Sequence, residues 1–572
     1  MKRSLSRLVF ALLVLTLVVP AFMVAQQKAQ TPSSSTSSGT NSGGYPTRKA
    51  TRTSSTNAPA VVERDFDDAL KIVQDEYVDG NKLDYNNVFK SSIIGMLRSL
   101  DPHSNYYDRD EFDELKTDQR SEYFGIGASI QNYAYGDEIN TFITATFENS
   151  PASRAGLRFG DRILEVDGEK MVGKQSVEVR DKIRGPRGST VTISIERAAD
   201  KSIQKVDITR DAVPQPSIPD AYMLKPGVAY IDMTRGFNYT TTDELEEALG
   251  KLHDKGMTSL VLDLRNNPGG FLDQAIHVAE IFLKNGQVVL TQKGRNGFRE
   301  YKSHNSSPDP TPLVILINEN TASASEIVAG AMQDHDRALI VGQTSFGKGL
   351  VQSIIPLEYG AGLTLTSAKY YTPSGRLIQR DYSNGGFYDY YTRGGVNQGE
   401  SRKEPVKPVG PERQTDTGRA VYGGGGISPD EMVTARTTNL VQRRLLSPTF
   451  TFARDVVNGR VHGLESYKVQ RDIDFNHNLQ SEDFKITDAI YKAFKEFALN
   501  DPNLKLTPAV LDRNRAFIEL ELRFNIVTAA YGRVIADRVF ITTDDPQVAK
   551  AVDVVPKARD LAMGRVEATS QP

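Results

Sequence analysis

Three short stretches in the middle of the chain carry residue types that together could perform a complete reaction. They supply a glycine-rich turn, a serine in a run of small residues and a lysine between two glycines. The stretches are Asp263-Leu-Arg-Asn-Asn-Pro-Gly-Gly270, Thr321-Ala-Ser-Ala-Ser-Glu326 and Phe346-Gly-Lys-Gly-Leu-Val-Gln352. A serine hydroxyl becomes a nucleophile when a neighbouring base removes its proton, and a neutral lysine can be that base. The three stretches therefore predict acyl transfer by a serine and a lysine.

Ser323 is placed where a nucleophile would be exposed. It follows an apolar run over 313–317, typical of a buried strand, and opens a helix expected over 322–334. A hydroxyl at such a junction lies near free helix N–H groups. The competing interpretation is a capping box between Ser323 and Glu326, in which the serine only satisfies backbone donors. On this stretch alone the capping box is favoured, and Thr321 and Ser325 are rival hydroxyls.

Lys348 changes that balance. Its ordinary pKa is near 10.4, so it acts as a base only if burial lowers the pKa. The flanking glycines let backbone pack closely around it. Gln352 would share a face with Lys348 on a strand expected over 350–355, and its amide could orient the lysine without adding charge. The alternative is a solvated turn lysine and an exposed strand glutamine.

The glycine turn after the expected strand over 259–264 offers backbone donors. A glycine N–H there and the N–H of Ala324 could form an oxyanion hole for the tetrahedral intermediate. The alternative is a tight turn between a strand and the helix expected over 272–284.

A β-rich segment near the front has a regular pattern of turns. The run Ser150–Gly168 begins a short helix at Pro151, ends it at a glycine and continues into a strand and a hairpin. This run resembles a PDZ domain. Upstream, a loop resembles the one with which PDZ domains hold a peptide C-terminus, where consecutive N–H groups converge on a carboxylate. Its residues are Phe124, Gly125, Ile126 and Gly127. The alternative is a small β-domain whose glycines only make turns.

Together these motifs resemble the carboxy-terminal processing proteases, the tail-specific serine peptidases with a Ser-Lys dyad. The resemblance runs from about residue 61 to 433. It includes Gly95-Met-Leu-Arg-Ser-Leu-Asp-Pro-His-Ser104, the segment 342–352 and Gly425-Gly-Ile-Ser-Pro-Asp430.

The resemblance implies the roles of single residues. The family nucleophile falls on Ser323, the lysine on Lys348 and the glutamine on Gln352. The oxyanion donors fall on Gly269 and Ala324, with Gly270 as the near alternative for the first. The implied fold is multidomain α/β: a PDZ β-module plus a ClpP/crotonase-like α/β protease core, with a helical N-terminal segment and a mixed C-terminal extension. The implied substrates are proteins or peptides with apolar C-termini.

Composition narrows the other function classes. A net charge of −3 argues against nucleic acid as a partner. The chain has no cysteine, and its seven histidines show no ligand-like spacing, so neither a metal nor another cofactor is expected. Three alternatives stay open: a Ser-His-Asp protease, a non-enzymatic PDZ scaffold and an acyl-CoA-binding crotonase-like protein. The first would use His277 or His335, although His335 lies in a charged patch, 333–337, that is typical of a solvated helix end.

The N-terminus predicts export. Lys2, Arg3 and Arg7 precede an uncharged stretch over 8–27, which is typical of a signal peptide and also long enough for a membrane anchor. The remainder is expected outside the cytoplasm, in the periplasm or another extracytoplasmic space, with inner-membrane anchoring as the alternative. The expected divisions are a signal peptide or anchor (1–27), a disordered tether (28–60), a helical region (61–110), a PDZ domain (111–200), a protease core (215–385), a polar linker (386–421), a return segment of the core (422–437) and a C-terminal extension (438–572).

Two further expectations concern partners. A homo-oligomer, most simply a dimer, is expected through the helices over 61–100 and the C-terminal extension, because both have amphipathic patterns. A regulatory partner is also compatible with the sequence.

Overall fold

The computed structural model describes residues 59–118, 122–135, 138–295, 297–383, 390–391, 410–469 and 472–565. The expected signal peptide or anchor (1–27) and nearly all of the expected tether (28–60) lie outside these residues. Within the described part of the chain, no helix combines the length and the apolar character needed to span a membrane. The chain divides into two units at Leu100, and each is described by itself.

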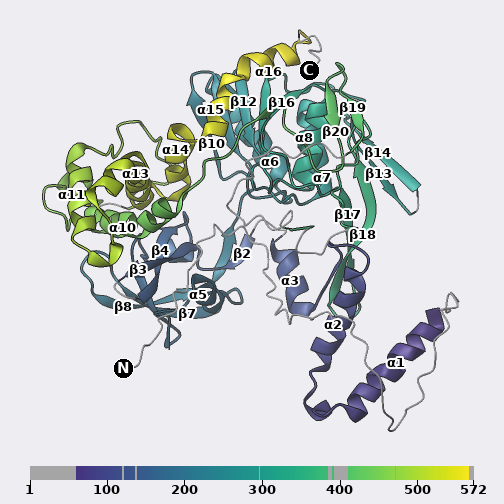
Figure 1. Ribbon diagram of the computed structural model, residues 1–572, viewed down its shortest axis with the longest axis horizontal. Coiled ribbons are helices and arrows are strands. Elements are labelled where there is room, and N and C mark those ends of the chain that lie inside the picture. The colour runs from purple at the N-terminus through teal and green to yellow at the C-terminus, as the bar shows by residue number, and fades with distance from the viewer. Residues whose placement is uncertain are drawn as a thin grey trace, which may run out of the picture. The chain divides into compact units, whose positions relative to one another are not determined.

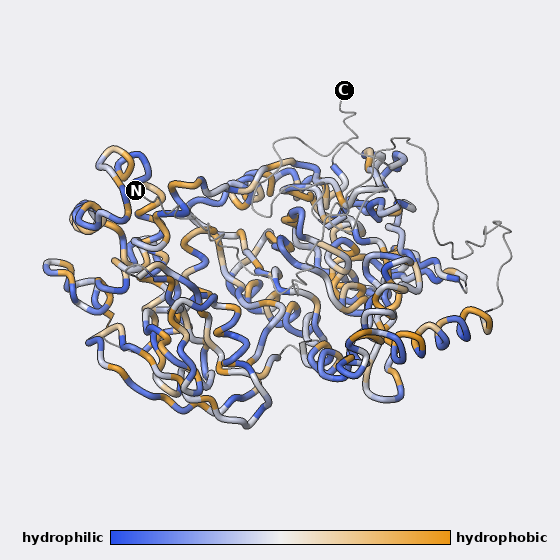
Figure 2. Tube along the Cα trace, turned by 60° about the horizontal axis from the view of Figure 1, so that its bottom comes forward, coloured by the Kyte–Doolittle hydropathy of each residue, from blue (hydrophilic) through white to orange (hydrophobic). Residues whose placement is uncertain are grey.

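The first unit is helical. It contains α1 (Pro59–Glu76), the short 3-10 helix η1 (Gly80–Lys82) and α2 (Tyr85–Arg98). Asp84 caps α2 by accepting hydrogen bonds from the amides of Asn86 and Asn87, so the helix lies within the helical region expected over 61–110. Hydrophobic and hydrophilic residues alternate along α1 (Figure 2). Several of its apolar side chains are exposed, among them Phe66, Val73 and Tyr77.

The second unit contains a β-rich module, which follows β1 (Asn105–Tyr107) and α3 (Arg109–Asp118) in the chain. Its main sheet has the antiparallel order β3-β4-β5-β7-β8, with β6 paired to β5. The strands are β3 (Ala128–Tyr135), β4 (Glu138–Thr146), β5 (Arg162–Val166), β6 (Glu169–Lys170), β7 (Thr190–Glu196) and β8 (Ile203–Thr209). The helices α4 (Pro151–Arg154) and α5 (Ser176–Ile183) pack on a core of aliphatic residues. Strand β3 lies at the edge of the sheet, and a separate ribbon of β2 (Glu122–Gly125) and β9 (Asp211–Pro214) leads to the next domain.

The central domain is built on a six-stranded sheet of order β10-β11-β12-β15-β16-β21, parallel except for β10 (Figure 1). The strands are β10 (Asp220–Lys225), β11 (Val228–Asp232), β12 (Ser259–Asp263), β15 (Leu313–Ile317), β16 (Ala338–Gly342) and β21 (Glu431–Met432). Every residue of β12, β15 and β16 is buried, as expected for parallel strands covered on both faces.

The two faces of this sheet are covered by different parts of the chain. One face packs on α6 (Thr241–Asp254), α7 (Leu272–Phe282) and α8 (Ala324–Asp334), which connect its own strands. Alternate strand residues, such as Val261 and Leu316, point to the other face, which is covered by α15 (Pro546–Asp553) and α16 (Val555–Ala562). The last helices of the described chain therefore complete the core of the central domain.

A second sheet stands beside the first. It has the order β1-β18-β13-β14, and β17 pairs with β18. Its strands are β1 (Asn105–Tyr107), β13 (Val288–Gly294), β14 (Gly297–Lys302), β17 (Leu350–Pro356) and β18 (Gly362–Tyr371), and α3 (Arg109–Asp118) follows β1. A small hairpin of β19 (Glu412–Gln414) and β20 (Ala420–Tyr422) lies at the end of the expected polar linker (386–421) and extends one residue beyond it, so part of that segment is folded structure.

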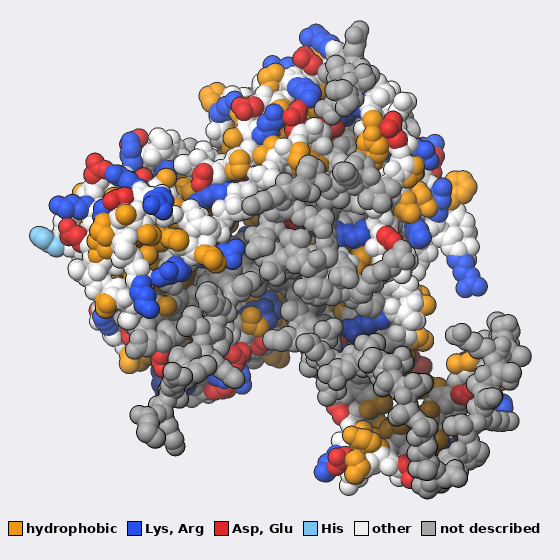
Figure 3. All heavy atoms as spheres, viewed as in Figure 1, with side chains coloured by type: hydrophobic (Ala, Val, Ile, Leu, Met, Phe, Trp, Pro, Cys, Tyr) orange, Lys and Arg blue, Asp and Glu red, His pale blue; other side chains and the backbone are white. Residues whose placement is uncertain are grey.

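The C-terminal extension is helical over its described residues, whereas a mixed structure was expected. Besides α15 and α16 it contains α10 (Leu440–Val457), the 3-10 helices η2 (Glu465–Tyr467) and η3 (Pro502–Leu504), α11 (Asp488–Leu499), α12 (Pro508–Arg513), α13 (Arg515–Tyr531) and α14 (Arg533–Thr543). Tyr133 of β3 stacks on Phe450 of α10 with ring centroids 3.9 Å apart, and Phe142 and Phe159 join the same apolar cluster. Charged and apolar side chains are interspersed over the visible surface (Figure 3). The multidomain α/β fold expected from the sequence is confirmed.

Candidate active site

Ser323 lies in the turn between β15 and α8, as expected. Its backbone is strained, with φ +56° and ψ −116°, a region that costs a non-glycine residue about 1–3 kcal/mol. The two rival hydroxyls are fully buried and serve backbone carbonyls: Thr321 donates to Leu264 at 2.7 Å, and Ser325 donates to Asn267 at 3.1 Å. Ser323 is half-buried. Of the three hydroxyls, it is the one that a substrate can reach.

Glu326, recognised in the sequence only as a capping residue, connects two parts of the site. Its buried carboxylate accepts a hydrogen bond from the backbone N–H of Ser323 at 2.8 Å, which is the reach-back half of a capping box. The same carboxylate accepts from the amides of Gly347 at 2.7 Å and Lys348 at 2.9 Å, and from the Ser345 hydroxyl. Burial raises the pKa of Glu326, and these hydrogen bonds oppose that rise. The sequence could not reveal the second set of bonds.

Lys348 sits in the glycine-flanked loop that precedes β17. The residue is half-buried, and burial lowers the pKa of its ammonium group to about 8, while the carboxylates of Glu326 and Asp101 act in the opposite direction. Tyr370 of β18 brings the lysine next to the serine. Its hydroxyl oxygen lies 2.7 Å from the Lys348 carbonyl oxygen and 3.0 Å from that of Ser323. No feature of the sequence pointed to Tyr370.

Gln352 lies on β17 near this loop, but simple strand alternation does not relate it to Lys348. The strand begins only at Leu350, and its pairing with β18 is shifted between Val351 and Gln352. The Gln352 amide donates to the Thr366 hydroxyl at 3.2 Å, and that hydroxyl donates to Asp101 at 2.9 Å. The proposed role of Gln352 in orienting the lysine stays a prediction.

The segment after Leu100, part of the Gly95–Ser104 motif, reaches the same region. Asp101 accepts hydrogen bonds from the amides of His103 and Ser104 and from the Ser104 hydroxyl. The pKa of His103 is lowered to about 3, mainly by burial and secondly by the positive charge of Lys348. This imidazole is therefore neutral at neutral pH. Its Nε2 lies 2.7 Å from the Tyr390 hydroxyl. The motif therefore supplies polar groups around the lysine.

The glycine turn lies directly against the serine. Gly269 has φ +95°, and a methyl group on it would lie 2.7 Å from Ser323 Cβ and 2.8 Å from Ala324 N. The N–H of Gly269 donates to Asn267 Oδ1 at 2.9 Å. The N–H of Ala324 belongs to the first turn of α8 and has no acceptor within the helix. The two expected oxyanion donors are thus brought together, with Gly270 next in the chain.

Arg265 holds the glycine turn in place through ion pairs and hydrogen bonds. The Arg265 guanidinium donates to both oxygens of Asp263 and, through Nη1, to Asp545 at 2.7 Å and Gln547 at 2.9 Å. Asp545 and Gln547 belong to the start of α15. The C-terminal extension, for which the sequence suggested only a scaffold or an oligomer contact, thereby contacts the loop beside Ser323.

The loop from Phe124 to Gly127, expected to bind a terminal carboxylate, already makes contacts within the protein. Phe124 and Gly125 pair with β9, and the carbonyl oxygen of the buried Ile126 accepts from the Ala152 amide at 2.7 Å. Gly127 has φ +73°, and the ring of Tyr123 lies against Gly125, where a methyl group on the glycine would be 2.8 Å from Tyr123 Cε2. Burial raises the pKa of Tyr123 to about 12, and the nearby backbone of Gly127 acts in the opposite direction. The side chain of Tyr123 therefore lies beside the donors expected to hold a peptide C-terminus.

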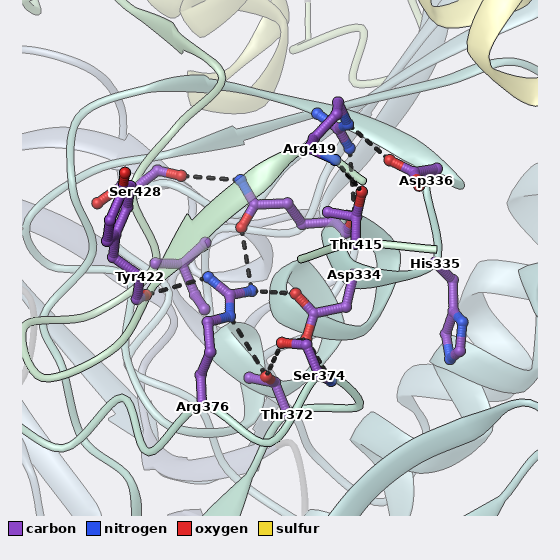
Figure 4. A network of polar contacts seen from close by, with 12 residues as sticks. Asp334, His335, Asp336, Thr372, Ser374, Arg376, Thr415, Arg419, Tyr422 and Ser428 are labelled. Atoms are coloured by element: carbon purple, nitrogen blue, oxygen red, sulfur yellow. Dashed lines mark hydrogen bonds and ion pairs between the residues drawn. The ribbon is translucent and has the colours of Figure 1, made fainter. Parts of the chain in front are cut away.

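The charged patch around His335 was expected to be a solvated helix end, and that expectation is wrong (Figure 4). Asp334 and Asp336 are buried and paired with Arg376 and Arg419, because the β19–β20 hairpin covers this end of α8. His335 contacts Asp416 through Nδ1 and the Val288 carbonyl oxygen through Nε2, each at 2.8 Å. Both ring nitrogens are engaged, in contacts separate from the ion pairs of Asp334 and Asp336 (Figure 4).

His277, the other histidine considered, is exposed on α7. None of the hydrogen bonds described around Ser323 involves His277. The geometry thus gives a Ser-His-Asp arrangement no support from either candidate histidine.

Comparison with known proteins identifies the family. The profile of Peptidase family S41 matches residues 227–385, and that of the PDZ domain matches residues 142–197. The carboxy-terminal-processing protease of Bartonella bacilliformis is 38% identical over 322 residues, which are 55% of this chain and 72% of that protein. The chain belongs to peptidase family S41. It is a carboxy-terminal-processing serine protease with a PDZ domain.

Three further proteins are similar to parts of this chain. A probable CtpA-like serine protease of Staphylococcus haemolyticus is 34% identical over 314 residues, which are 54% of this chain and 61% of that protein. The solved photosystem II D1 C-terminal processing protease is 26% identical, with a TM-score of 0.34, covering 64% of this chain and 92% of that one. The PDZ domain of a carboxy-terminal protease from Vibrio cholerae, solved in complex with peptide, is 32% identical, with a TM-score of 0.15, covering 16% of this chain and 97% of that one. The family expected from the motifs is confirmed.

Proposed function

We propose that this S41 peptidase cleaves peptide bonds in protein substrates with Ser323 as the nucleophile, Lys348 as the general base and Gln352 as the amide that orients the lysine. The observation that carries the proposal is the hydroxyl of Tyr370, which lies within hydrogen-bonding distance of the carbonyl oxygens of both Ser323 and Lys348. The nucleophile and the base are therefore neighbours, although they belong to different loops. A lysine whose pKa lies near 8 is neutral in a useful fraction of molecules at neutral pH.

The reaction proceeds in two halves. Neutral Lys348 Nζ takes the proton of the Ser323 hydroxyl as Oγ attacks the carbonyl carbon of the scissile peptide. The protonated lysine then gives its proton to the leaving amine, the C–N bond breaks and the acyl group stays on Ser323 as an ester. A water molecule attacks the ester while Lys348 takes one of its protons. That proton passes to Ser323 Oγ as the C–O bond breaks, and the second product leaves as a carboxylic acid, which releases its proton to solvent.

The oxyanion of each tetrahedral intermediate is held by backbone N–H groups. Ala324 supplies one donor from the start of α8, where the helix dipole adds to the attraction. Gly269 supplies the other, sharing or exchanging its bond to Asn267 Oδ1, and the adjacent Gly270 is the alternative donor. The direct contact between Gly269 and Ser323 supports this assignment.

The PDZ domain captures the substrate by its C-terminal tail. The edge position of β3 allows an extended peptide to add to the sheet, and the loop from Phe124 to Gly127 supplies the amides for the terminal carboxylate. The side chains of the tail would face α5, which lies beside β3. Capture by the tail then brings an upstream peptide bond to Ser323.

The decisive experiment uses the purified protein and two matched variants, Ser323→Ala and Lys348→Ala. Each is incubated with an unfolded reporter that ends in an apolar tail, and with the same reporter ending in two aspartates. Cleavage of only the apolar-tailed reporter, lost in both variants, is the expected result. Cleavage that persists in Lys348→Ala would remove the lysine from the mechanism, and cleavage that persists in Ser323→Ala would remove the serine.

We also propose that the protease is exported. The basic residues Lys2, Arg3 and Arg7 before the uncharged stretch over 8–27 support this. Residues 1–60 fused to a phosphatase that is active only outside the cytoplasm should give an active fusion. Replacing Leu12 and Leu15 by arginine, which interrupts the uncharged stretch, should abolish that activity. An active fusion after this replacement would contradict the proposal.

A further inference from the structure

Two buried polar side chains grip the backbone of the same two residues. The carboxylate oxygen Glu326 Oε2 accepts from the N–H of Ser323 at 2.8 Å and from the N–H of Lys348 at 2.9 Å. The hydroxyl of Tyr370 is shared between the carbonyl oxygens of Ser323 and Lys348, at 3.0 Å and 2.7 Å. Each of the two residues is thus held through both its N–H and its C=O.

This arrangement exceeds what local structure requires. The start of α8 needs from Glu326 only the bond to the Ser323 amide, because that bond completes a capping box. The bonds from Gly347 and Lys348 contribute nothing to the helix, yet they fix the lysine loop to the same carboxylate. Tyr370 comes from β18, in the other sheet, and its ring is 1% exposed. Side chains from two separate elements, α8 and β18, therefore meet at one pair of residues.

We infer that Glu326 and Tyr370 are positioning residues that keep the nucleophile and the base of this protease at a fixed distance from each other. The pair Glu326 and Tyr370 is called the clamp. The inference rests on the proposed roles of Ser323 and Lys348. The strained backbone of Ser323 makes such a clamp necessary, since a residue at φ +56° relaxes unless its surroundings prevent it. A fixed distance between hydroxyl and amine matters because a displacement of about 1 Å can cost about 100-fold in rate.

Glu326 carries a carboxyl group and Tyr370 a neutral hydroxyl. Substitutions at the two positions should therefore change the pH dependence of catalysis differently. Four titratable or charged groups act on Lys348 or share its surroundings: Glu326 from α8, Asp101 and His103 from the segment after Leu100, and Arg380 from the segment after β18. Glu326 and Asp101 favour the protonated lysine. A neutral residue at 326 therefore eases deprotonation of Lys348, whereas loss of the Tyr370 hydroxyl removes no charge.

The test measures kcat and KM of the full chain from pH 6 to 10 for Tyr370→Phe, Glu326→Gln and the control Tyr222→Phe. Tyr222 is also a buried tyrosine, but its hydroxyl has no hydrogen-bond partner among the described residues and lies on β10. Thermal unfolding and the rate of labelling by a fluorophosphonate, which reacts with activated serines, are recorded for each variant.

Tyr370→Phe should lower kcat and the labelling rate about 10- to 100-fold, leave KM within about threefold and leave the acid limb of the pH profile in place. Glu326→Gln should lower kcat and move the acid limb about one unit towards lower pH. Tyr222→Phe should match the parent protein. A folded Tyr370→Phe protein with kcat within twofold of the parent would overturn the inference, as would an equal loss in Tyr222→Phe.

The same series separates this inference from the proposed function. If Ser323→Ala and Lys348→Ala are inactive while Tyr370→Phe and Glu326→Gln keep the parental kcat and pH profile, only the clamp is disproved. If Lys348→Ala stays active, the catalytic assignment fails, and the clamp fails with it.

Discussion

Gly269 lies so close to Ser323 that a methyl group in place of one of its α-hydrogens would be 2.7 Å from Ser323 Cβ. The same methyl group would lie 2.8 Å from the Ala322 carbonyl oxygen and from the Ala324 amide. Only glycine fits, both because of this contact and because its φ is +95°. The glycine turn and the turn that contains Ser323 are therefore packed directly against each other.

Gly269→Ala should reduce kcat at least about 100-fold, as loss of an oxyanion donor does, because the methyl group pushes the turn away from Ser323. The matched control is Gly286→Ala. Gly286 has a similar φ of +87° but open space where the methyl group would lie. Both variants should lose stability, by about 1 kcal/mol or more, while only Gly269→Ala should lose activity per folded molecule. Equal kcat in the two variants would argue against the oxyanion role of this turn.

The pH dependence of catalysis should follow Lys348. Burial lowers its pKa to about 8, and only the neutral amine can accept the Ser323 proton. We expect kcat/KM to fall about tenfold per unit below pH 8 and to reach a plateau above it. A profile centred near pH 6.5 would instead indicate a histidine base.

The same buried amine should cost the protein stability. The pKa of Lys348 is about 8 in the folded state and about 10.4 in the unfolded chain, so the unfolded chain binds the proton more tightly. This penalty is complete below pH 8 and disappears as the pH rises to about 10.4. Lys348→Met should therefore raise the free energy of unfolding by about 1–3 kcal/mol at pH 7, and by much less at pH 10. Urea denaturation at both pH values measures the difference, and an equal gain at pH 7 and pH 10 would contradict it.

Tyr123 should compete with the substrate tail. Its hydroxyl lies near the backbone amide of Gly127, which the terminal carboxylate is proposed to use, and its ring lies against Gly125. Tyr123→Phe removes that hydroxyl, and the affinity for a peptide with an apolar C-terminus should rise by about two- to tenfold, the free-energy range of one hydrogen bond. Fluorescence anisotropy with the free acid and the C-terminal amide of one peptide gives the control. An equal gain for the amide would disprove the competition.

Asp545 should matter for activity despite its distance in sequence from the catalytic loops. Its carboxylate binds Arg265 at 2.7 Å and also caps α15 by accepting from the amides of Gln547 and Val548. Asp545→Ala should lower the free energy of unfolding by about 1–3 kcal/mol and reduce kcat, because the glycine turn loses part of its support.

The neighbouring Asp544 provides the comparison. It pairs with Arg436 and is half exposed, so Asp544→Ala should change stability by less than about 1 kcal/mol. A kcat for Asp545→Ala equal to that of Asp544→Ala would show that the turn does not depend on the C-terminal extension.

The sequence predicted those features that depend on neighbouring residues. The strand over 313–317 has the expected bounds, the run Ser150–Gly168 contains the expected strand, and α8 begins at Ala324, two residues after the predicted start. Continuous apolar runs and glycine turns are local signals, and they place Ser323 and Gly269 at the ends of neighbouring strands. The PDZ domain was predictable for the same reason.

What the sequence could not predict depends on contacts between distant residues. The bonds from Lys348 to Glu326, from Tyr370 to Ser323 and from Arg265 to Asp545 leave no periodic pattern. The patch around His335 shows a different difficulty. A run of charged residues looks the same in the sequence whether its side chains are solvated or buried in ion pairs, as they are here. Only the hairpin of β19 and β20, which lies at the end of the expected linker, decides between the two.

The helices α15 and α16 cover one face of the central sheet, and this fixes the order in which the molecule can be completed. A ribosome releases β12, β15 and β16 long before it releases these helices. Until then the outer face of the sheet stays uncovered, and Arg265 has no Asp545 to bind. The loop beside Ser323 therefore lacks this support until α15 has been synthesised, so the catalytic site is completed only after a segment far along the chain has folded onto the sheet.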